Sequence, residues 1–370
     1  MICLSIPWPP DYGGAIDMWY KIQAFRRAEI PVILHCFEYD RPQSPVLEKY
    51  CENVYYYPRQ RRVRDLLSIV PFIVKSRKNN RLVKNLLQDN SPILIEGIHS
   101  SWLAQHPLLK NREVWLRLHN IESDYYKNLA RLETKWSKKL FFFTESLKLK
   151  RYEKKHINVS GVFCISENDY SFFKNIYKNC HLIPPFHGHN KVQSTPGKGN
   201  FLLYHGNLAL AENQRNALFL AHLSSRFPLP LIIAGKAAPA HFINKLKPFN
   251  GVQLQTDLPQ EAMDNLLREA SIILLPAIQT TGFRLKLLSS LYKGRHVIAD
   301  PRLVVDTGLA PLVHLARTKD EWFDIINHLS NKPLDTQDIK LRQRLLNPFS
   351  DNNNAKKMIS MIFSEPVSVE

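Results

Sequence analysis

The second half of the chain alternates short apolar runs with amphipathic stretches. Apolar runs of a few residues are typical of buried strands, whereas apolar residues spaced three and four apart predict one face of a helix. In residues 261–270, for example, Ala262, Leu266 and Ala270 fall on one helical face. The strands predicted in this half are residues 202–204, 229–234, 252–254, 272–275 and 297–299. Short apolar strands separated by helices indicate a parallel sheet covered on both faces.

The first half follows the same pattern less regularly, with longer helical stretches between the strands. Its predicted strands are residues 2–6, 32–37, 54–57, 93–96, 114–118 and 161–165. Residues 184–200 are rich in proline and glycine and lack periodicity, which indicates a linker. A chain of 370 residues suffices for two domains. We expect an α/β protein with an N-terminal Rossmann-like domain (1–188), a linker (189–200), a C-terminal Rossmann-like domain (201–340) and a helical segment (341–370) that crosses the domain junction.

The chain is strongly basic, with a formal net charge of +17 at pH 7. Residues 1–190 carry 29 Lys and Arg against 18 Asp and Glu, so this half holds most of the excess. Two segments, residues 59–84 and 127–155, combine basic side chains with apolar clusters. Such segments suit an anionic membrane surface, and a solvated basic face explains them equally well. Nucleic acid is not an expected partner, because the sequence shows no basic and aromatic stacking motif and no zinc finger.

The five cysteines form no CxxC pair and no metal-ligand spacing with the histidines, which favours a reducing compartment. The N-terminus has no basic leader before its short apolar run. The longest apolar runs, residues 66–74 and 272–278, fall far short of the roughly 20 residues of a membrane span. We therefore expect a cytoplasmic protein, held at most peripherally at the inner face of the membrane.

Candidate chemistry lies where predicted strands end, because ligands of parallel α/β sheets bind beyond the carboxyl ends of the strands. After the first strand, Gly13 and Gly14 precede a helix, and paired glycines before a helix N-terminus suit an anion. A plain turn would look the same.

The strand at residues 114–118 is followed by three polar side chains, His119, Asn120 and Glu122. An apolar strand that stops in polar residues favours a functional role for His119. For Asn120 and Glu122 the simpler interpretation is a helix cap and a favourable charge in the first helical turn.

In the second half, one strand ends at Gly206 and Asn207, and the next ends at Gly235 and Lys236. Each pair is weak evidence alone, and Lys236 could equally be an ordinary exposed lysine.

Residues 276–288 are the most informative segment. A strand ends, a loop with Thr281 and Gly282 follows, and a helix opens with Arg284 and Lys286 in its first turn. Basic side chains are unfavourable near the positive end of a helix dipole. A bound phosphate would offset that conflict, since amides, dipole and both side chains would then bind one anion.

At these residues the chain resembles the retaining, family-four glycosyltransferases of the GT-B fold, of the bacterial cell-envelope polysaccharide type. The resemblance covers nearly the whole chain and is most specific in residues 282–288, the Lys293-Gly294 pair and the strand after it. It implies two Rossmann-like domains with parallel sheets facing a cleft. Such enzymes need no bound metal when side chains and helix dipoles stabilise the leaving nucleoside diphosphate.

The resemblance also implies a role for each matching residue. His119 would be the catalytic residue beside the transferred sugar, and Arg284 and Lys286 would neutralise the diphosphate. The other residues expected at the donor are Gly13, Gly14, Asn120, Gly206, Asn207, Lys236, Thr281, Gly282, Phe283 and Ser289.

The chain departs from the family at two pairs of positions. Thr281 and Ser289 stand where the family usually has glutamates, and Asn207 and Asn213 stand where it often has an Arg and a Lys. A hydroxyl accepts a hydrogen bond more weakly than a carboxylate does. These departures bear on donor identity and on activity.

The sequence therefore predicts a retaining hexosyltransferase, with mannose as one candidate sugar. It would move a sugar from a sugar nucleotide to a glycan or lipid-linked acceptor, without a metal or other cofactor. Two alternatives share the fold. A sugar-nucleotide 2-epimerase would need acid and base side chains in the cleft, and a non-catalytic sugar-nucleotide binder would fit Thr281 and Ser289.

Overall fold

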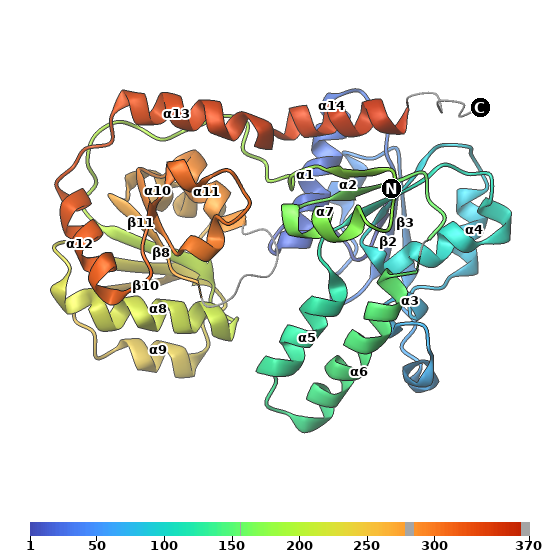
Figure 1. Cartoon of the computed structure of the whole chain (residues 1–370), viewed down its shortest axis with the longest axis horizontal. Coiled ribbons are helices and arrows are strands. Elements are labelled where there is room, and N and C mark those ends of the chain that lie inside the picture. Colours follow the sequence, from blue (N-terminus) through green and yellow to red (C-terminus); the bar gives the residue numbers. More distant parts are fainter. Residues whose placement is uncertain (156, 278–284, 364–370) are drawn as a thin grey trace. The chain divides into compact units, whose positions relative to one another are not determined.

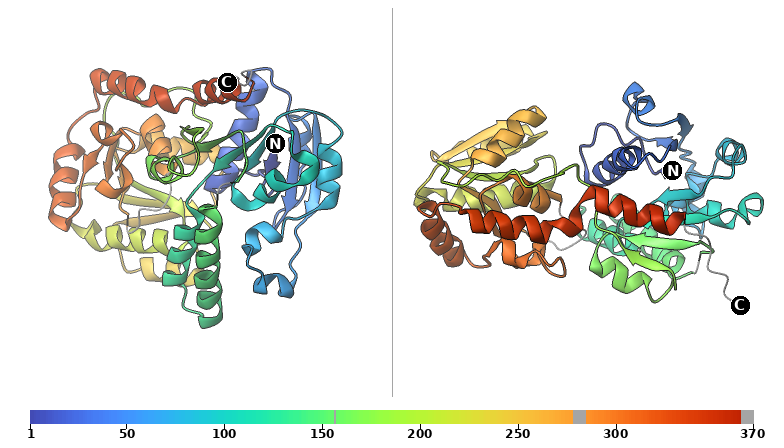
Figure 2. Two further views of the ribbon diagram at one scale, coloured as in Figure 1. Left: turned by 45° about the vertical axis from the view of Figure 1, so that its right-hand side comes forward. Right: turned by 90° about the horizontal axis from the view of Figure 1, so that it is seen from above.

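The computed structural model describes residues 1–155, 157–277 and 285–363, and these divide into two compact units. The first unit consists of residues 1–188 and 349–363, and the second of residues 189–277 and 285–348. Each unit contains one parallel sheet with helices on both of its faces (Figures 1 and 2). The predicted fold class, two Rossmann-like units with parallel sheets, is confirmed.

The sheet of the first unit has the strand order β3-β2-β1-β4-β5-β6-β7, and every neighbouring pair is parallel. Its strands are β1 (Ile2–Cys3), β2 (Ile33–Glu38), β3 (Asn53–Pro58), β4 (Ile93–Glu96), β5 (Val114–Leu118), β6 (Gly161–Cys164) and β7 (Cys180–Leu182). Its helices are α1 (Gly13–Arg27), α2 (Pro45–Glu48), α3 (Phe72–Lys75), α4 (Asn80–Leu86), α5 (Glu122–Leu132), α6 (Trp136–Glu153), α7 (Glu167–Phe173) and α14 (Asp351–Ile362). Since β1 and β4 are neighbours, the sheet grows in opposite directions from β1, and the gap between their ends is the topological switch point.

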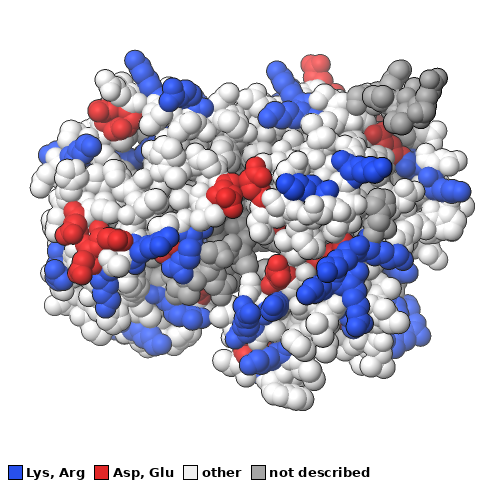
Figure 3. Space-filling model, in the orientation of Figure 1, with Lys and Arg blue, Asp and Glu red and all other residues white. Residues whose placement is uncertain are grey.

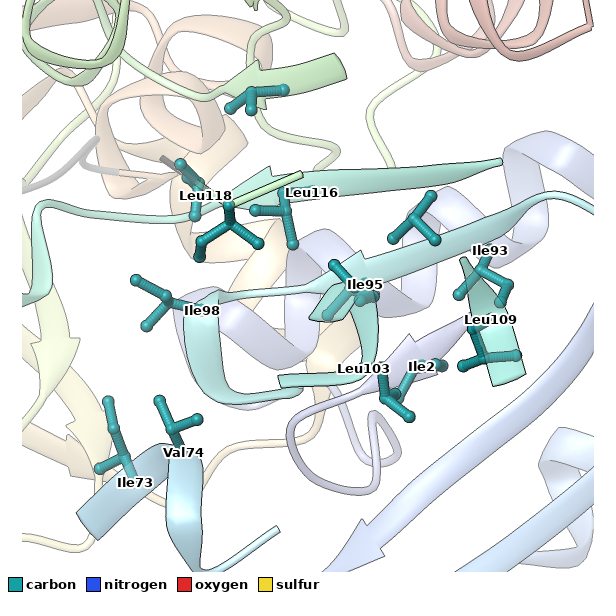
Figure 4. Packing of buried hydrophobic residues seen from close by; sticks show 14 of the residues in the cluster. Ile2, Ile73, Val74, Ile93, Ile95, Ile98, Leu103, Leu109, Leu116 and Leu118 are labelled. Atoms are coloured by element: carbon teal, nitrogen blue, oxygen red, sulfur yellow. The ribbon is translucent and has the colours of Figure 1, made fainter. Parts of the chain in front are cut away.

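Alternate residues of these strands enter two different cores, because side chains alternate across a strand. Ile2, Ile95 and Leu116 lie in the core of one face, together with Ile73 and Val74 (Figure 4). The residues next to them in sequence lie in the core of the other face, which α1 and α14 cover. The strands are therefore buried on both sides, as their continuous apolar runs predicted.

The sheet of the second unit has the order β10-β9-β8-β11-β12-β13, again parallel throughout. Its strands are β8 (Leu202–Asn207), β9 (Leu231–Lys236), β10 (Val252–Thr256), β11 (Ile272–Leu275), β12 (His296–Ala299) and β13 (His314–Leu315). Its helices are α8 (Ala211–Leu223), α9 (Ala240–Leu246), α10 (Gln260–Glu269), α11 (Leu285–Lys293), α12 (Lys319–Ser330) and α13 (Thr336–Leu346). The switch point here lies between β8 and β11, which repeats the arrangement of β1 and β4.

Two features differ from the predicted elements. The first strand ends at Cys3 instead of residue 6, because Arg77 donates two hydrogen bonds to the carbonyl of Leu4, at 3.0 and 2.9 Å. The edge strands β7 and β13 were not predicted, since they are short and their residues are only partly buried.

The C-terminal region is helical, as predicted, and it is interrupted near Pro348. The break is a short 3-10 turn at Asn347–Phe349 between α13 and α14. Among the described residues, no helix combines the length and the apolar content that a membrane span requires.

Candidate functional site

Three sequence-distant residues meet at the switch point of the first unit. Gly14 follows β1, Glu96 ends β4 and His119 follows β5, and these three strands are consecutive neighbours in the sheet. The Nε2 atom of His119 lies 2.9 Å from the Oε2 atom of Glu96. A Cβ atom on Gly14 would lie 3.6 Å from His119 Nδ1 and 3.0 Å from the ring of Tyr12. Glycine at this position therefore keeps space beside the histidine ring.

His119 belongs to a buried cluster of charged side chains. Lys21 Nζ lies 2.8 Å from Asp17 Oδ2 and 2.7 Å from Glu96 Oε1. Arg117 donates to Asp17 Oδ1 at 2.9 Å. Asp17, Lys21, Glu96 and Arg117 are each at most 2% exposed, and His119 is 8% exposed. Since buried charges are costly unless paired, each member depends on the others.

The cluster holds both carboxylates in their charged form. Burial alone would raise the pKa of Asp17, but Arg117, Lys21 and His119 together lower it below its usual value. In the same way Lys21 and His119 outweigh burial and lower the pKa of Glu96. A carboxylate at Glu96 accepts a hydrogen bond from the Nε2–H of His119, and this fixes the orientation of the imidazole ring.

Asp17, Glu96 and His119 offer atoms within 4.8 Å of one another, a spacing that could hold a metal ion. However, the ammonium group of Lys21 already lies within hydrogen-bonding distance of both carboxylates. The positive charge that a metal would supply is thus provided by a side chain, so the donor set does not fit a resident cation.

The residues after His119 form the N-terminus of α5, and this helix is not capped as the sequence predicted. The N-terminus of α5 is capped by Glu153 of α6, which accepts hydrogen bonds from the backbone N–H groups of Glu122 and Ser123. The interpretation of Asn120 as the helix cap was wrong, since the N-cap position is Ile121 and the Asn120 side chain hydrogen-bonds the Glu122 carboxyl.

Glu122 lies in the first turn of α5, as expected, but not as a favourable charge. Burial and the neighbouring Glu153 raise the pKa of Glu122 to about 8, so this carboxyl is largely protonated at neutral pH. Burial likewise raises the pKa of Glu153 to about 7. A neutral carboxylic acid gains little from the helix dipole, and it can donate a proton.

We expect Glu122→Gln to make the protein more stable than the wild type as pH rises. Between the usual pKa of 4.5 and about 8 the unfolded wild-type chain releases this proton and the folded chain keeps it, so wild-type stability falls with pH. The amide of the variant does not titrate, so its stability lacks this pH dependence. The free energy of unfolding that the wild type loses amounts to about 1.4 kcal/mol for each unit by which the pKa of Glu122 is raised. Urea unfolding at several pH values measures it.

The matched control is Glu261→Gln, at an exposed position of α10. It is expected to leave the pH dependence of unfolding unchanged. If Glu122→Gln shows the same dependence as the wild type, Glu122 is ionised in the folded protein at neutral pH.

In the second unit, Gly206, Asn207, Gly235 and Lys236 lie side by side at the carboxyl ends of β8 and β9. Gly206 pairs with Gly235, and Asn207 pairs with Lys236. A Cβ atom on Gly235 would come within 2.0 Å of the Gly206 carbonyl oxygen, so a larger residue does not fit there. Lys236 is exposed, which agrees with its interpretation as an ordinary surface lysine.

Asn207 and Asn213 stabilise the loop between β8 and α8. Asn213 Nδ2 donates to the Asn207 carbonyl at 2.8 Å, and Asn207 Oδ1 accepts from Ala209 N at 3.0 Å. The neutral amides therefore shape the loop that follows β8.

Helix α11 begins at the switch point of this unit, with Lys286 in its first turn. The Lys286 ammonium lies 5.5 Å from the ring centre of Tyr204 in β8. Ser289 hydrogen-bonds His189 Nε2 at 3.0 Å, and Ser290 hydrogen-bonds His205 Nε2 at 2.9 Å. Burial and the ammonium groups of Lys286 and Lys293 lower the pKa of His205 to about 3, so His205 is neutral. The predicted site residues Thr281, Gly282, Phe283 and Arg284 lie outside the described residues.

The sequence indicated His119 as a candidate but did not indicate the residues that contact it. Asp17 and Lys21 are four residues apart on the buried face of α1, and Glu96 and Arg117 lie in otherwise apolar strands. Charged residues inside apolar elements were the signal available, since such charges are seldom buried without partners.

The chain is similar to several known proteins. No protein-family model matches it. It is 26% identical over 389 residues to an uncharacterized 44.6 kDa protein in the cps region of Klebsiella pneumoniae. This alignment covers 99% of this chain and 98% of that protein. Among solved structures it resembles sucrose-phosphate synthase from Thermosynechococcus elongatus, with a TM-score of 0.69 and 14% identity over 97% of this chain and 96% of the other. It also resembles HepE of Anabaena, solved with UDP and glucose, with a TM-score of 0.61 and 15% identity over 95% and 97%.

These likenesses span nearly the full length of both chains, and they agree with the strand orders of the two sheets. The chain therefore has the GT-B fold of these glycosyltransferases.

Proposed function

We propose that this protein is a glycosyltransferase that moves a sugar from a nucleoside-diphosphate sugar to a glycan or lipid-linked acceptor, with retention of configuration. The observation that carries the proposal is the His119 ring, oriented by Glu96 next to Gly14 at the switch point of the first unit. In open α/β sheets this is the place where ligands bind. The solved relative HepE, of the same fold, carries UDP and glucose.

The donor diphosphate binds at the switch point of the second unit. The first turn of α11 supplies Lys286, and Arg284 precedes it in the sequence. Backbone N–H groups and the helix dipole add to these charges, so the developing negative charge of the leaving diphosphate is stabilised without a metal. The presence of Lys21 between Asp17 and Glu96 supports this metal-independent mechanism.

His119 positions the sugar and stabilises positive character at the anomeric carbon, through its ring or its carbonyl. A fixed ring suits this role, because catalytic stabilisation requires groups that are already oriented before the reaction. The acceptor oxygen attacks on the face from which the diphosphate leaves, so no protein side chain acts as a nucleophile. Retention follows from this geometry.

The acceptor binds in the first unit, beyond the ends of β2 and β3. The Arg59 guanidinium lies over the ring of Tyr39, 4.4 Å from its centre, and Arg61 lies 4.6 Å from the same ring. Aromatic rings and guanidinium groups suit a sugar or an anionic head group. The relative from a cps region supports a polysaccharide product. The protein acts in the cytoplasm, held peripherally at the inner face of the membrane.

One observation favours an alternative enzyme class. Glu122 follows His119 by three residues, and Glu153 contacts the backbone of Glu122. Both are buried carboxyls, with pKa values of about 8 and 7, and a sugar-nucleotide 2-epimerase needs acid and base groups of this kind. Product analysis separates the two classes, since epimerisation requires no acceptor. Sugar-nucleotide binding without turnover of either kind would indicate a non-catalytic binder.

A panel of sugar nucleotides, scored by thermal shift, tests the proposal. A ligand that binds only the folded protein raises its melting temperature. We expect Arg284→Ala combined with Lys286→Ala to weaken binding of the stabilising nucleoside diphosphate, since each lost charged hydrogen bond costs about 1.5–3 kcal/mol. Isothermal calorimetry measures the affinity.

The control for this double variant is Lys245→Ala combined with Lys247→Ala, at exposed positions near the end of α9. It removes the same net charge and is expected to keep wild-type affinity. Unchanged affinity in the Arg284 and Lys286 variant would place the diphosphate elsewhere.

A further inference from the structure

The first unit exposes an unusual number of large apolar side chains in two segments. Leu67 is 90% exposed, Ile69 86% and Trp136 75%. The set comprises Val63, Leu66, Leu67 and Ile69 in the segment before α3, Tyr125 and Leu132 on α5, and Trp136, Leu140, Phe143 and Leu147 on α6. A group of exposed apolar side chains of this kind on a folded protein marks an interaction site.

The exposed residues of α6 form one stripe. Trp136, Leu140, Phe143 and Leu147 are spaced by four, three and four residues, which places them on the same face of the helix. This face points away from the core, whereas Leu149 on the other side of α6 is fully buried. Helix α6 therefore carries its apolar stripe on an exposed face, while its buried residues are Glu145, Ser146, Leu149 and Glu153.

The two segments form one surface, which we call the apolar edge: residues 63–69 with the exposed faces of α5 and α6. Lys148 of α6 donates to the carbonyl oxygen of Leu66 at 2.6 Å. The ring of Phe72 packs edge-on against Phe141, with 6.1 Å between centres, and Phe72 N donates to Glu145. Helices α5 and α6 pack along each other as a hairpin that projects from the unit (Figures 1 and 2).

The charge around the apolar edge is mainly positive. Exposed basic residues adjoin it, namely Arg61, Arg62, Arg64, Lys127, Arg131, Lys135, Lys138 and Lys139. Three acidic side chains of the same segments point inward: Asp65 pairs with Lys75, Glu145 pairs with Lys148, and Glu153 caps α5. Asp124 is exposed and Glu133 is partly exposed, so two acidic side chains remain among the basic ones. Basic side chains gather over this part of the face shown in Figure 3. Exposed basic side chains thus outnumber the acidic ones at this surface, and its net charge is positive.

This combination selects one kind of partner. A second copy of the chain would bring the same positive charge against it, and like charges oppose such contact. A nucleic acid would match the charge but not the projecting leucine, isoleucine and phenylalanine side chains. An anionic bilayer matches both, since apolar side chains enter the region below the head groups while Lys and Arg bind the phosphates. Tryptophan, here Trp136, is favoured at that depth.

We propose that the apolar edge is the surface by which this protein inserts into an anionic membrane, with residues 63–69 and the stripe of α6 as the inserted parts. The role of this membrane contact rests on the proposed function: it would hold the transferase next to a lipid-linked acceptor. Arg59 and Arg61, proposed above to bind the acceptor, immediately precede residues 63–69 in the chain. A membrane held at this edge would present its head groups to them.

The test is flotation of the full-length protein with vesicles of phosphatidylcholine mixed equally with phosphatidylglycerol, and with vesicles of phosphatidylcholine alone. We expect binding to the anionic vesicles that weakens as salt is added, because exposed charges are screened. An apolar variant, Leu67→Ser with Ile69→Ser and Trp136→Ser, removes insertion. A charge variant, Lys135→Glu with Lys138→Glu and Lys139→Glu, reverses the attraction. Each is expected to lower vesicle affinity by about tenfold or more.

Matched controls carry equivalent changes at exposed positions outside the apolar edge: Leu108→Ser with Val305→Ser, and Lys245→Glu with Lys247→Glu and Lys319→Glu. Both are expected to bind vesicles as the wild type does. All variants should keep the thermal shift given by the sugar nucleotide, so a failure of donor binding is seen separately from a failure of membrane binding.

Three results would overturn the inference. The first is a wild-type protein that does not float with anionic vesicles at low salt. The second is apolar and charge variants that bind as tightly as their controls. The third is light scattering that shows a wild-type dimer lost in the apolar variant, which would make the apolar edge an interface between copies.

Discussion

Replacing Lys21 with methionine is expected to lower the free energy of unfolding by about 3–5 kcal/mol. The Lys21 ammonium lies within 2.9 Å of carboxylate oxygens from both Asp17 and Glu96, and all three side chains are buried. Methionine fills similar space but removes the ammonium charge. The two buried carboxylates of Asp17 and Glu96 are then no longer balanced by two basic side chains. Urea unfolding at neutral pH measures the loss.

Two further variants make this result specific. Lys139→Met, at an exposed position of α6, is expected to change stability by less than about 0.5 kcal/mol. Adding Glu96→Gln to Lys21→Met should recover part of the loss, because an amide carries no charge to be buried. A Lys21→Met protein as stable as the Lys139→Met control would show that Arg117 alone balances the cluster.

Replacing His119 with alanine is expected to lower turnover by about 100-fold, the size of effect seen when one oriented catalytic group is removed. Affinity for the nucleoside diphosphate should change little, since the proposed phosphate-binding residues belong to the other unit. Transfer assays with the donor found in the nucleotide panel, together with calorimetry, measure both quantities.

Because His119 is buried and bonded to Glu96, its replacement will also lower the melting temperature, and turnover must be expressed per folded molecule. Glu96→Gln serves as the companion variant. It keeps a hydrogen-bond acceptor for Nε2 but removes the charge, and a positioning role predicts a smaller loss of turnover than in His119→Ala. Wild-type turnover in the folded His119→Ala protein would remove His119 from the catalytic site.

The sequence predicted most strands because burial on both faces demands continuous apolar runs. The runs at residues 93–96, 114–118 and 272–275 coincide with β4, β5 and β11. Edge strands β7 and β13 were not predicted from the sequence, because a partly exposed strand of two or three residues does not form a continuous apolar run. Glycine-containing strand ends at Gly206 and Gly235 were also visible, and the structure places them in register beside each other.

Residue types and their spacing thus determined the elements, the fold class and His119 as a candidate. Only the tertiary structure decided which charges surround that histidine, because Asp17, Glu96 and Arg117 are brought together by strand order across about a hundred positions of sequence. The same holds for Glu122, whose raised pKa depends on burial against Glu153. It also holds for the apolar edge. The sequence showed basic and apolar residues mixed along two segments. Only the fold shows that Glu145 points inward, paired with Lys148, and that the apolar stripe of α6 faces outward.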